Sequence, residues 1–262
     1  MPRPEDVVFP RRPERSDERQ KERQGRKLLD EFFDHATLLA ISRLVSQGEF
    51  ESIDFPISTG KEGGVFRATK GAEFRAVKVY RIGNTTFRHL PPYALEELRR
   101  STSVRNYGGL IIAWTRREHT VLGRLAEVGV RAPRPYAHLR NVLVMEFIRD
   151  GDGPAPRLRD ALVEDPAALY EDLVTQIGRM VRNAHLVHGD LSPYNTLYSA
   201  GHVVLIDVAQ AIPTDHPQAA KLLERDLGHY ARFLGRLGVE VDSAEFLRAV
   251  GGDRLGPAPA EA

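Results

Sequence analysis

Apolar residues recur along this chain at spacings that predict helices and strands in a definite order. Leucine, phenylalanine and alanine return at helical spacing through residues 26–47, and Gly48 then ends the pattern. Two short runs rich in aromatic and β-branched residues follow at 65–69 and 74–80, and the polar turn between them is typical of a hairpin. We therefore expect one amphipathic helix followed by a pair of strands.

The remainder of the chain predicts more helix than strand. The polar stretch 82–109 contains proline and glycine, so we expect a mobile loop there, and helical spacing returns at 112–125. A compact apolar run at 142–148 predicts one strand. Two well-patterned helices are expected after it, at 169–184 and at 217–237.

These elements divide the chain into a strand-bearing part and a mainly helical part. The arm at 1–24 is rich in Arg, Glu and Pro with almost no apolar periodicity, which indicates disorder. We expect an N-terminal helix and a β-rich lobe at 25–148, a helical lobe at 149–250, and a flexible Gly/Pro/Ala-rich tail at 251–262. The expected fold class is α+β, with two lobes.

Composition narrows the class of protein. Hydrophobic residues make up 42% of the chain, enough for a core, and 37 Lys plus Arg against 36 Asp plus Glu give a net charge of +1. We therefore expect no strong general binding to nucleic acid, and any RNA contact must be local. There is no cysteine, no signal-peptide pattern and no long uncharged apolar run, so a cytoplasmic protein with no membrane partner is expected.

Three polar side chains late in the sequence indicate the chemistry. Asp190 and Asn195 lie on one loop, residues 188–195, which we call the catalytic loop. Asp207 follows the short apolar strand at 203–206. Carboxylate and amide oxygens are ligands that suit Mg²⁺, and a positioned carboxylate can accept a hydrogen bond from an attacking hydroxyl. Their order and spacing are typical of a protein-kinase-like site that transfers a phosphoryl group from ATP.

A glycine-rich segment precedes the first hairpin strand and is a candidate phosphate loop. Glycines allow backbone amides to approach phosphate oxygens, and small hydroxyl residues can add hydrogen bonds. The segment matches neither G-x-G-x-x-G nor a Walker A loop, so a purely structural turn is the alternative. Its candidate nucleotide-binding residues are Ser58, Thr59, Gly60, Lys61, Glu62, Gly63 and Val65.

A lysine on the second hairpin strand strengthens the phosphate-loop interpretation. Lys78 could reach the α- and β-phosphates if a carboxylate on a nearby helix held it, and Glu118 is the candidate. Taken singly, a solvated strand lysine and a surface glutamate would be the simpler interpretations. The order of glycine loop, lysine, glutamate, apolar strand, catalytic loop and metal aspartate favours the functional one.

Several other residues are assigned supporting roles. Main-chain groups at Met145, Glu146 and Ile148, at the end of the apolar strand, could bind adenine, although a plain buried strand fits the same pattern. His188 is expected to brace the catalytic loop rather than carry a proton. Asp226 would be costly to bury unpaired, so we expect it to accept hydrogen bonds from the catalytic-loop backbone or else to be an ordinary exposed acid.

With these motifs placed, roughly residues 25–240 resemble the RIO kinases, an atypical protein kinase family, and within them the first subfamily. The resemblance rests on several separate motifs in order, and the glycine-rich loop and the catalytic loop are two of them. The others are Val79-Tyr80-Arg81 after the lysine, Ala155-Pro156-Arg157-Leu158-Arg159-Asp160 after the apolar strand, Asp207-Val208-Ala209-Gln210, and Asp215-His216-Pro217. Gly63-Gly64, Gly189 and Pro193 depart from the residues usual in the family.

The resemblance implies a trimmed bilobal kinase fold and a role for each candidate. Asp190 would be the catalytic base, Asn195 and Asp207 the metal ligands, and Lys78 the phosphate lysine paired with Glu118. Pro156 would join the nucleotide-binding residues. The implied cofactors are ATP and Mg²⁺, with Mn²⁺ as a second candidate ion.

The family further implies serine/threonine kinase activity together with ATPase activity through an aspartyl-phosphate at Asp207. The implied partners are a protein substrate or the chain itself through autophosphorylation, and precursors of the small ribosomal subunit. The chain lacks the A-P-E element of ordinary protein kinases, which favours a restricted substrate. Two alternatives remain at this stage: a small-molecule phosphotransferase like the aminoglycoside kinases, and a ribosome-assembly factor switched by ATP.

Overall fold

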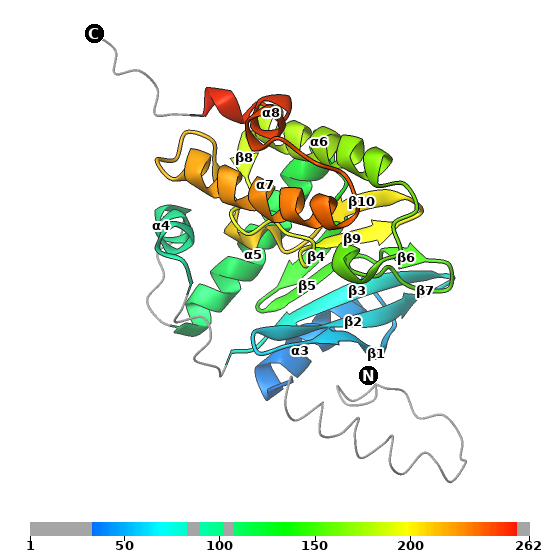
Figure 1. The fold of residues 1–262 in the computed structure, drawn as a ribbon. Helices are drawn as coiled ribbons and strands as arrows, with labels where there is room; N and C mark the ends of the chain where they lie inside the picture. The colour runs from blue at the N-terminus through cyan, green and yellow to red at the C-terminus, as the bar shows by residue number, and fades with distance from the viewer. Residues whose placement is uncertain (1–32, 83–89, 102–106, 256–262) are drawn as a thin grey trace. The chain divides into compact units, whose positions relative to one another are not determined.

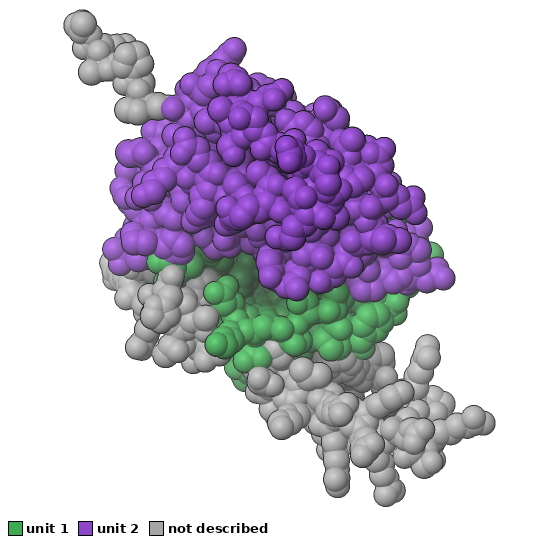
Figure 2. All heavy atoms as spheres, viewed as in Figure 1, with its two compact units in different colours: residues 1–90, 102–119, 135–147 green, residues 91–101, 120–134, 148–262 purple. Residues whose placement is uncertain are grey.

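The computed structural model describes residues 33–82, 90–101 and 107–255 (Figure 1). They group into two compact units (Figure 2). Unit 1 holds the chain up to Leu90 together with 102–119 and 135–147, and unit 2 holds 91–101, 120–134 and the chain from Ile148 onward. One boundary at residue 148, as expected from the sequence, therefore does not separate the two units, because the segments at 91–101 and 120–134 also belong to unit 2. The arm at 1–24 lies outside the described residues.

Unit 1 is built on a five-stranded antiparallel sheet in the order β1-β2-β3-β5-β4. The hairpin expected from the sequence is confirmed as β2 and β3, which pair with Val65 opposite Lys78. The strands β1 and β4 were not expected. The strands are β1 (Ser52–Thr59), β2 (Gly63–Lys70), β3 (Glu73–Tyr80), β4 (Pro135–Leu139) and β5 (Val142–Glu146).

Helix α3 (His35–Ser46) contacts β4 and β5 and completes the core of unit 1. Asp34 caps its first turn by accepting a 2.7 Å hydrogen bond from the Thr37 N–H. Helix α3 lies within the range 26–47 where the pattern predicted a helix, and residues 26–32 of that range lie outside the described residues. The core is a continuous cluster of buried side chains that includes Ile41, Leu44, Phe66, Val77 and Val144.

The stretch 82–109, expected to be a loop, contains helix α4 (Pro92–Ser101) and the start of helix α5 (Tyr107–Glu127). The loop prediction is therefore wrong for these residues, while 83–89 and 102–106 lie outside the described part. Tyr93, Ala94 and Leu98 of α4 are buried at helical spacing, a signal obscured by the charged residues around them. Residues 107–119 of α5 belong to unit 1 and the rest of α5 to unit 2.

Unit 2 consists mainly of helices that pack around short strand pairs. The expected helices at 169–184 and 217–237 are confirmed as α6 (Pro166–Arg182) and α7 (Ala219–Arg236). A short helix α8 (Ser243–Ala249) was not expected, and the 3₁₀ turn η4 (Gly252–Arg254) holds the buried Gly252, so the tail is ordered at least to Leu255. Residues 256–262 lie outside the described part.

The short strands of unit 2 form three separate antiparallel pairs. The 3₁₀ turn η2 (Leu158–Asp160) lies between β7 and helix α6, and the 3₁₀ turn η3 (Val208–Gln210) lies between β10 and β11. The strand expected before Asp207 is confirmed as β10. The pairs are β6 (Arg149–Asp150) with β7 (Gly153–Pro154), β8 (Leu186–Val187) with β11 (Ile212–Pro213), and β9 (Thr196–Ser199) with β10 (His202–Leu205).

Candidate active site

In unit 1, Lys78 and Glu118 form a buried ion pair. Lys78 Nζ lies 2.7 Å from Glu118 Oε1, and the two side chains are 12% and 2% exposed. The Tyr80 hydroxyl donates a hydrogen bond to the other oxygen of the same carboxylate. Lys78 and Tyr80 are two positions apart on β3, so they share one face of the strand, and α5 brings Glu118 to that face. A buried carboxylate is tolerated here because two donors offset its desolvation.

The glycine-rich segment forms the turn between β1 and β2. Ser58 and Thr59 end β1, and the Gly60 N–H donates a 2.9 Å hydrogen bond to the carbonyl of Gly63 at the start of β2. The Glu62 carbonyl accepts a 2.9 Å hydrogen bond from the Arg81 N–H, which ties the turn to the end of β3.

The two glycines of this turn differ in their surroundings. A Cβ atom at Gly63 would lie 2.3 Å from the carbonyl oxygen of Val79, so β2 can approach β3 here only without a side chain. A Cβ atom at Gly60 would meet nothing closer than 3.9 Å. Gly60, Lys61 and Glu62 are exposed. Gly63 therefore has a packing role in the sheet, and the exposed part of the turn is what remains available to a ligand.

The residues proposed to contact adenine end β5 and continue past it. Met145 is buried and pairs with Ala76, whereas Glu146 is exposed at the end of the strand. The Ile148 carbonyl, in unit 2, accepts a 3.0 Å hydrogen bond from the Ala155 N–H. Pro156 follows Ala155 in the chain, and the Pro156 carbonyl accepts a 3.0 Å hydrogen bond from the Tyr198 N–H. The carbonyl groups of Ile148 and Pro156 are therefore used within unit 2.

In unit 2, Asp190 and Asn195 contact each other across the catalytic loop. Asn195 Nδ2 donates to the Asp190 carbonyl at 2.8 Å and to Asp190 Oδ2 at 3.0 Å. Gln210 Nε2 approaches the same carboxylate oxygen at 3.3 Å. The amide nitrogen of Asn195 is thus committed to Asp190, so Oδ1 is the atom of Asn195 that can ligate a cation.

Asp207 follows β10 and begins the turn η3. Its backbone has φ 60° and ψ 44°, the left-handed conformation that Asp and Asn tolerate better than most residues with a side chain. The Ile206 N–H donates a 3.1 Å hydrogen bond to the Asn195 carbonyl, which joins the segment before Asp207 to the catalytic loop. The preceding strand is anchored to α6, because Asp172 Oδ2 accepts a 2.8 Å hydrogen bond from the Val203 N–H.

Buried polar side chains brace the catalytic loop from helix α7. Asp226 is fully buried, and its Oδ2 accepts a 3.0 Å hydrogen bond from the Gly189 N–H, which confirms the contact proposed from the sequence. Burial raises the pKa of Asp226, although Arg225, His188 and a backbone N–H of the loop act in the opposite direction. His188 Nε2 lies 2.9 Å from the Ile206 carbonyl, so His188 also has a bracing position.

Two further side chains hold Gly189 and were not identified from the sequence. The Tyr93 hydroxyl, on α4, donates to the Gly189 carbonyl at 2.6 Å, and Arg225 donates to the same oxygen. Tyr93 OH also lies 3.1 Å from Gln210 Oε1. Gly189 has φ 79°, and a Cβ there would lie 3.3 Å from the Tyr93 ring, so glycine suits this crowded left-handed position.

The donor set of unit 2 fits a hard cation that is only partly held by protein. Within the described residues, no group of three or more His, Asp or Glu side chains gathers that could hold a metal ion alone. One carboxylate from Asp207 and one amide oxygen from Asn195 are the kind of set that binds Mg²⁺ together with water and substrate phosphates.

Three comparisons with known proteins place the chain in a family. A sequence model of the RIO domain matches residues 64–246, most of the chain. The RIO-type serine/threonine-protein kinase Rio1 of Haloferax volcanii is 41% identical over 228 residues, which cover 87% of this chain and 78% of that protein. The chain belongs to the RIO kinase family. It is a RIO-type serine/threonine-protein kinase of the first subfamily, as the sequence predicted.

More distant relatives support the same assignment. The serine/threonine-protein kinase RIO1 of Caenorhabditis elegans is 35% identical over 238 residues, which cover 89% of this chain but only 47% of that longer protein. The Rio2 kinase of Chaetomium thermophilum, solved as an ADP/Mg²⁺-phosphoaspartate complex, shares the fold with a TM-score of 0.63 at 24% identity over 84% of this chain and 67% of that one. The α+β kinase-like fold is therefore confirmed, and the small-molecule phosphotransferase alternative is not favoured.

The structure adds Tyr80, Tyr93, Arg225 and Gln210 to the site residues that the sequence suggested. Tyr80 could have been found, because it is two positions from Lys78 and shares its strand face. Gln210 belongs to the motif Asp207-Val208-Ala209-Gln210, but its contact with Asp190 was not expected. Tyr93 and Arg225 are brought to the catalytic loop only by packing, and no local pattern marks them. Within the described residues, no helix is long and apolar enough to span a bilayer.

Proposed function

We propose that this RIO kinase transfers the γ-phosphoryl group of ATP, bound with Mg²⁺, to a serine or threonine hydroxyl, with Asp190 orienting the acceptor. The observation that carries the proposal is the 3.0 Å hydrogen bond from Asn195 Nδ2 to Asp190 Oδ2. This contact holds Asp190 in one orientation and leaves the amide oxygen of Asn195 for the cation. A positioned carboxylate and a metal ligand on one loop are the two groups that phosphoryl transfer needs there.

The remaining roles follow from charge and position. Asn195 Oδ1 and Asp207 would hold Mg²⁺, which neutralises charge on the phosphate oxygens when bound; Mn²⁺ would be accepted by the same oxygen ligands. Lys78, held by Glu118, would bind the α- and β-phosphates, and the exposed turn at Gly60 would lie over them. The proposal requires both residue sets to act on one ATP molecule, which the variants below test.

We propose that the turn and strand-end residues bind the nucleotide together, but that they do so in different ways. Gly63 and Val65 would act by shaping the sheet behind the turn. The hydroxyl, amide and charged groups that contact the nucleotide would come from Ser58, Thr59, Gly60, Lys61 and Glu62. Met145, Glu146, Ile148 and Pro156 would contact adenine through backbone and apolar atoms.

An aspartyl-phosphate at Asp207 is proposed as a second outcome of the same site. The Asp207 carboxylate oxygen would form a bond to the γ-phosphorus while the bond to the bridging oxygen breaks, and ADP would leave with that electron pair. Water would then hydrolyse the acyl phosphate and complete an ATPase cycle. The phosphoaspartate in the Chaetomium thermophilum Rio2 complex supports this chemistry in a protein of the same fold.

Incubation of the purified chain with γ-labelled ATP and Mg²⁺ tests both outcomes together. We expect label on the protein and release of phosphate, and we expect Asp190→Ala to lose the acid-stable label of phosphoserine or phosphothreonine. Label that hydroxylamine removes would identify the acyl phosphate. Full retention of acid-stable labelling in Asp190→Ala would refute its assigned role.

The protein substrate is proposed to be the chain itself or a restricted partner. The expectation of small ribosomal subunit precursors rests on the family resemblance and stays a prediction. Co-sedimentation with such particles, compared between the wild type and Asp190→Ala, would test it and would also separate a kinase from an ATP-switched assembly factor.

A further inference from the structure

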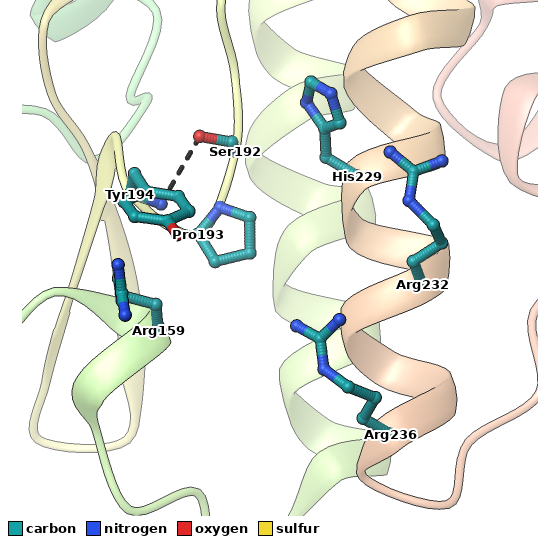
Figure 3. A pocket seen from close by; sticks show the side chains of 7 residues that line it. All are labelled: Arg159, Ser192, Pro193, Tyr194, His229, Arg232 and Arg236. Atoms are coloured by element: carbon teal, nitrogen blue, oxygen red, sulfur yellow. Dashed lines mark hydrogen bonds between the residues drawn. The ribbon is translucent and has the colours of Figure 1, made fainter.

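Unit 2 contains a pocket of about 460 Å³ beside the catalytic loop. One wall consists of Arg159 and the loop segment 192–194, and the other is formed by His229, Arg232 and Arg236 of helix α7 (Figure 3). The loop wall begins two residues after Asp190. The pocket therefore lies next to the residue proposed to orient the acceptor, and none of the roles assigned above uses it.

The lining of this pocket is strongly cationic. Three guanidinium groups and one imidazole line it, and no carboxylate does. Arg232 and Arg236 are exposed, lie four positions apart on α7 and form no ion pair with another described residue. Two like charges at this spacing are unfavourable on a helix unless an anion lies between or beside them. Within the described part of the chain, the one ion pair of Arg159 is with its neighbour Asp160, and both side chains are about half exposed, so this pair is weak.

The pocket is fixed relative to the catalytic loop by the same face of α7. Arg225 donates to the Gly189 carbonyl, and His229 Nδ1 lies 3.0 Å from the Leu191 carbonyl. Arg232 and Arg236 continue this face by further steps of three and four residues. A ligand held by these two arginines would therefore keep a constant position relative to Asp190.

We propose that this pocket binds an anionic side chain, a carboxylate or a phosphorylated residue, of the protein segment whose serine or threonine is phosphorylated. The proposal rests on the proposed function and names the substrate class of that site. Guanidinium groups bind carboxylate and phosphate through paired, charge-assisted hydrogen bonds. A pocket that supplies several of them beside the acceptor position selects acceptor sites with an acidic or previously phosphorylated neighbour.

The observations favour a protein segment over an RNA backbone. Binding to RNA phosphates needs cationic groups distributed over several nucleotides, and the net charge of this chain is only +1. Tyr194 is 51% exposed and could stack on a base, but the Arg159 guanidinium lies 4.3 Å from its ring centroid and covers one face. The charge is instead concentrated in one open pocket of side-chain size.

Direct binding of labelled peptides tests the proposal without relying on catalysis. The probes are three peptides of one sequence around a serine acceptor that differ at a single neighbouring position, which carries phosphoserine, glutamate or alanine. We expect fluorescence anisotropy to show the phosphoserine peptide binding about tenfold more tightly than the alanine peptide, with the glutamate peptide between them. Inorganic phosphate should compete with the phosphoserine peptide.

Charge-reversed and charge-conserving variants locate the binding site. In Arg232→Glu/Arg236→Glu the difference between the phosphoserine and alanine peptides should disappear, whereas Arg232→Lys/Arg236→Lys should retain part of it. Arg232→Gln/Arg236→Gln repeats the test without introducing acidic groups, in case reversal affects folding. The matched control is Arg124→Glu, an exposed arginine on α5 that does not line the pocket, and it should bind all three peptides as the wild type does.

The outcomes separate this inference from the proposed function. Equal binding of the three peptides by the wild type, or a preference that survives charge reversal, would overturn the inference. Tight binding of an RNA oligonucleotide that is lost in Arg232→Glu/Arg236→Glu, without a preference among the peptides, would also overturn it. If the wild type fails to hydrolyse ATP, the proposed function is refuted. The comparison of the three peptides still decides whether the pocket binds an anionic side chain.

Discussion

The fully buried carboxylate of Asp226, on helix α7, accepts a 3.0 Å hydrogen bond from the backbone N–H of Gly189 in the catalytic loop. These residues are 37 positions apart in the chain. The contact satisfies a buried donor in the residue that directly precedes Asp190, so the position of the proposed catalytic carboxylate depends on it.

Asp226→Ala is expected to lower both stability and turnover. The Gly189 N–H would lose its acceptor, and the free energy of unfolding should fall by about 2 kcal/mol. Because the loop loses a brace, kcat should fall more than the affinity for ATP. Urea denaturation and steady-state ATP hydrolysis measure the two effects, and Asp226→Asn, which keeps an acceptor oxygen, is the control. Unchanged kcat in Asp226→Ala would contradict the bracing role.

The raised pKa of Asp226 predicts how stability varies with pH. Because burial raises the folded-state pKa above the ordinary value near 3.8, the folded protein binds this proton more tightly than the unfolded chain does. The stability that protonated Asp226 contributes is fully present below that ordinary value and is lost as pH rises through the folded-state pKa. The unfolding free energy of Asp226→Asn, relative to the wild type, should therefore increase as pH rises through this window.

Urea denaturation of the wild type and of Asp226→Asn at a series of pH values checks whether the difference in unfolding free energy increases with pH. A difference that decreases with rising pH would show that Arg225 and the Gly189 N–H stabilise the carboxylate more than burial destabilises it.

Gly63→Ala and Gly60→Ala should behave differently although both lie in the glycine-rich segment between β1 and the start of β2. A Cβ at Gly63 would overlap the Val79 carbonyl, so the pairing of β2 with β3 must shift, and the free energy of unfolding should fall by about 2 kcal/mol or more. At Gly60 there is room, and stability should change by less than about 0.5 kcal/mol. Thermal unfolding of both variants makes the comparison; similar losses would show that Gly63 has no special packing role.

Removal of the Glu118 carboxylate should destabilise unit 1. Glu118→Ala takes away the acceptor that Lys78 and Tyr80 contact in a buried environment, and we expect a loss of about 3 kcal/mol in unfolding free energy. Tyr80→Phe removes one donor and leaves the ion pair, so its loss should be about 1 kcal/mol. If Lys78 binds phosphate as proposed, KM for ATP should rise strongly in Glu118→Ala and only slightly in Tyr80→Phe. The reverse order of the two KM values would count against that role.

Asp207→Asn should abolish Mg-ATP turnover while leaving the fold intact. Asparagine tolerates the left-handed backbone at this position as aspartate does, so the change removes a charge without adding strain. Asp207→Ala should also lose turnover, with a further loss of about 1 kcal/mol in stability because alanine is strained there. Phosphate release and thermal unfolding measure the two effects. Turnover at the parental rate in Asp207→Asn would refute the assignment of Asp207 as a metal ligand.

The elements with strong periodicity could be predicted from the sequence, whereas the irregular ones could not. The β2–β3 hairpin and helices α6 and α7 follow their apolar patterns to within a few residues. Strand β1 was missed because its pairing with β2 shifts register twice, between Ile53 and Phe55 and again between Pro56 and Ser58, so its buried positions do not alternate.

By itself, the sequence determined which chemical groups this protein carries and in what order: a glycine turn, a lysine on a strand, a catalytic loop and an aspartate after the next strand. Those are local features, set by residue type and spacing within a few positions of each other. Only the tertiary structure decided partners that the sequence did not indicate, such as Tyr93 and Arg225, which both donate to the Gly189 carbonyl. It also selected the contacts expected for Glu118 and Asp226 over the alternative that both are exposed acids. Such contacts arise from the packing of whole elements in each unit, and they leave no periodic trace in the sequence because each needs only one well-placed side chain.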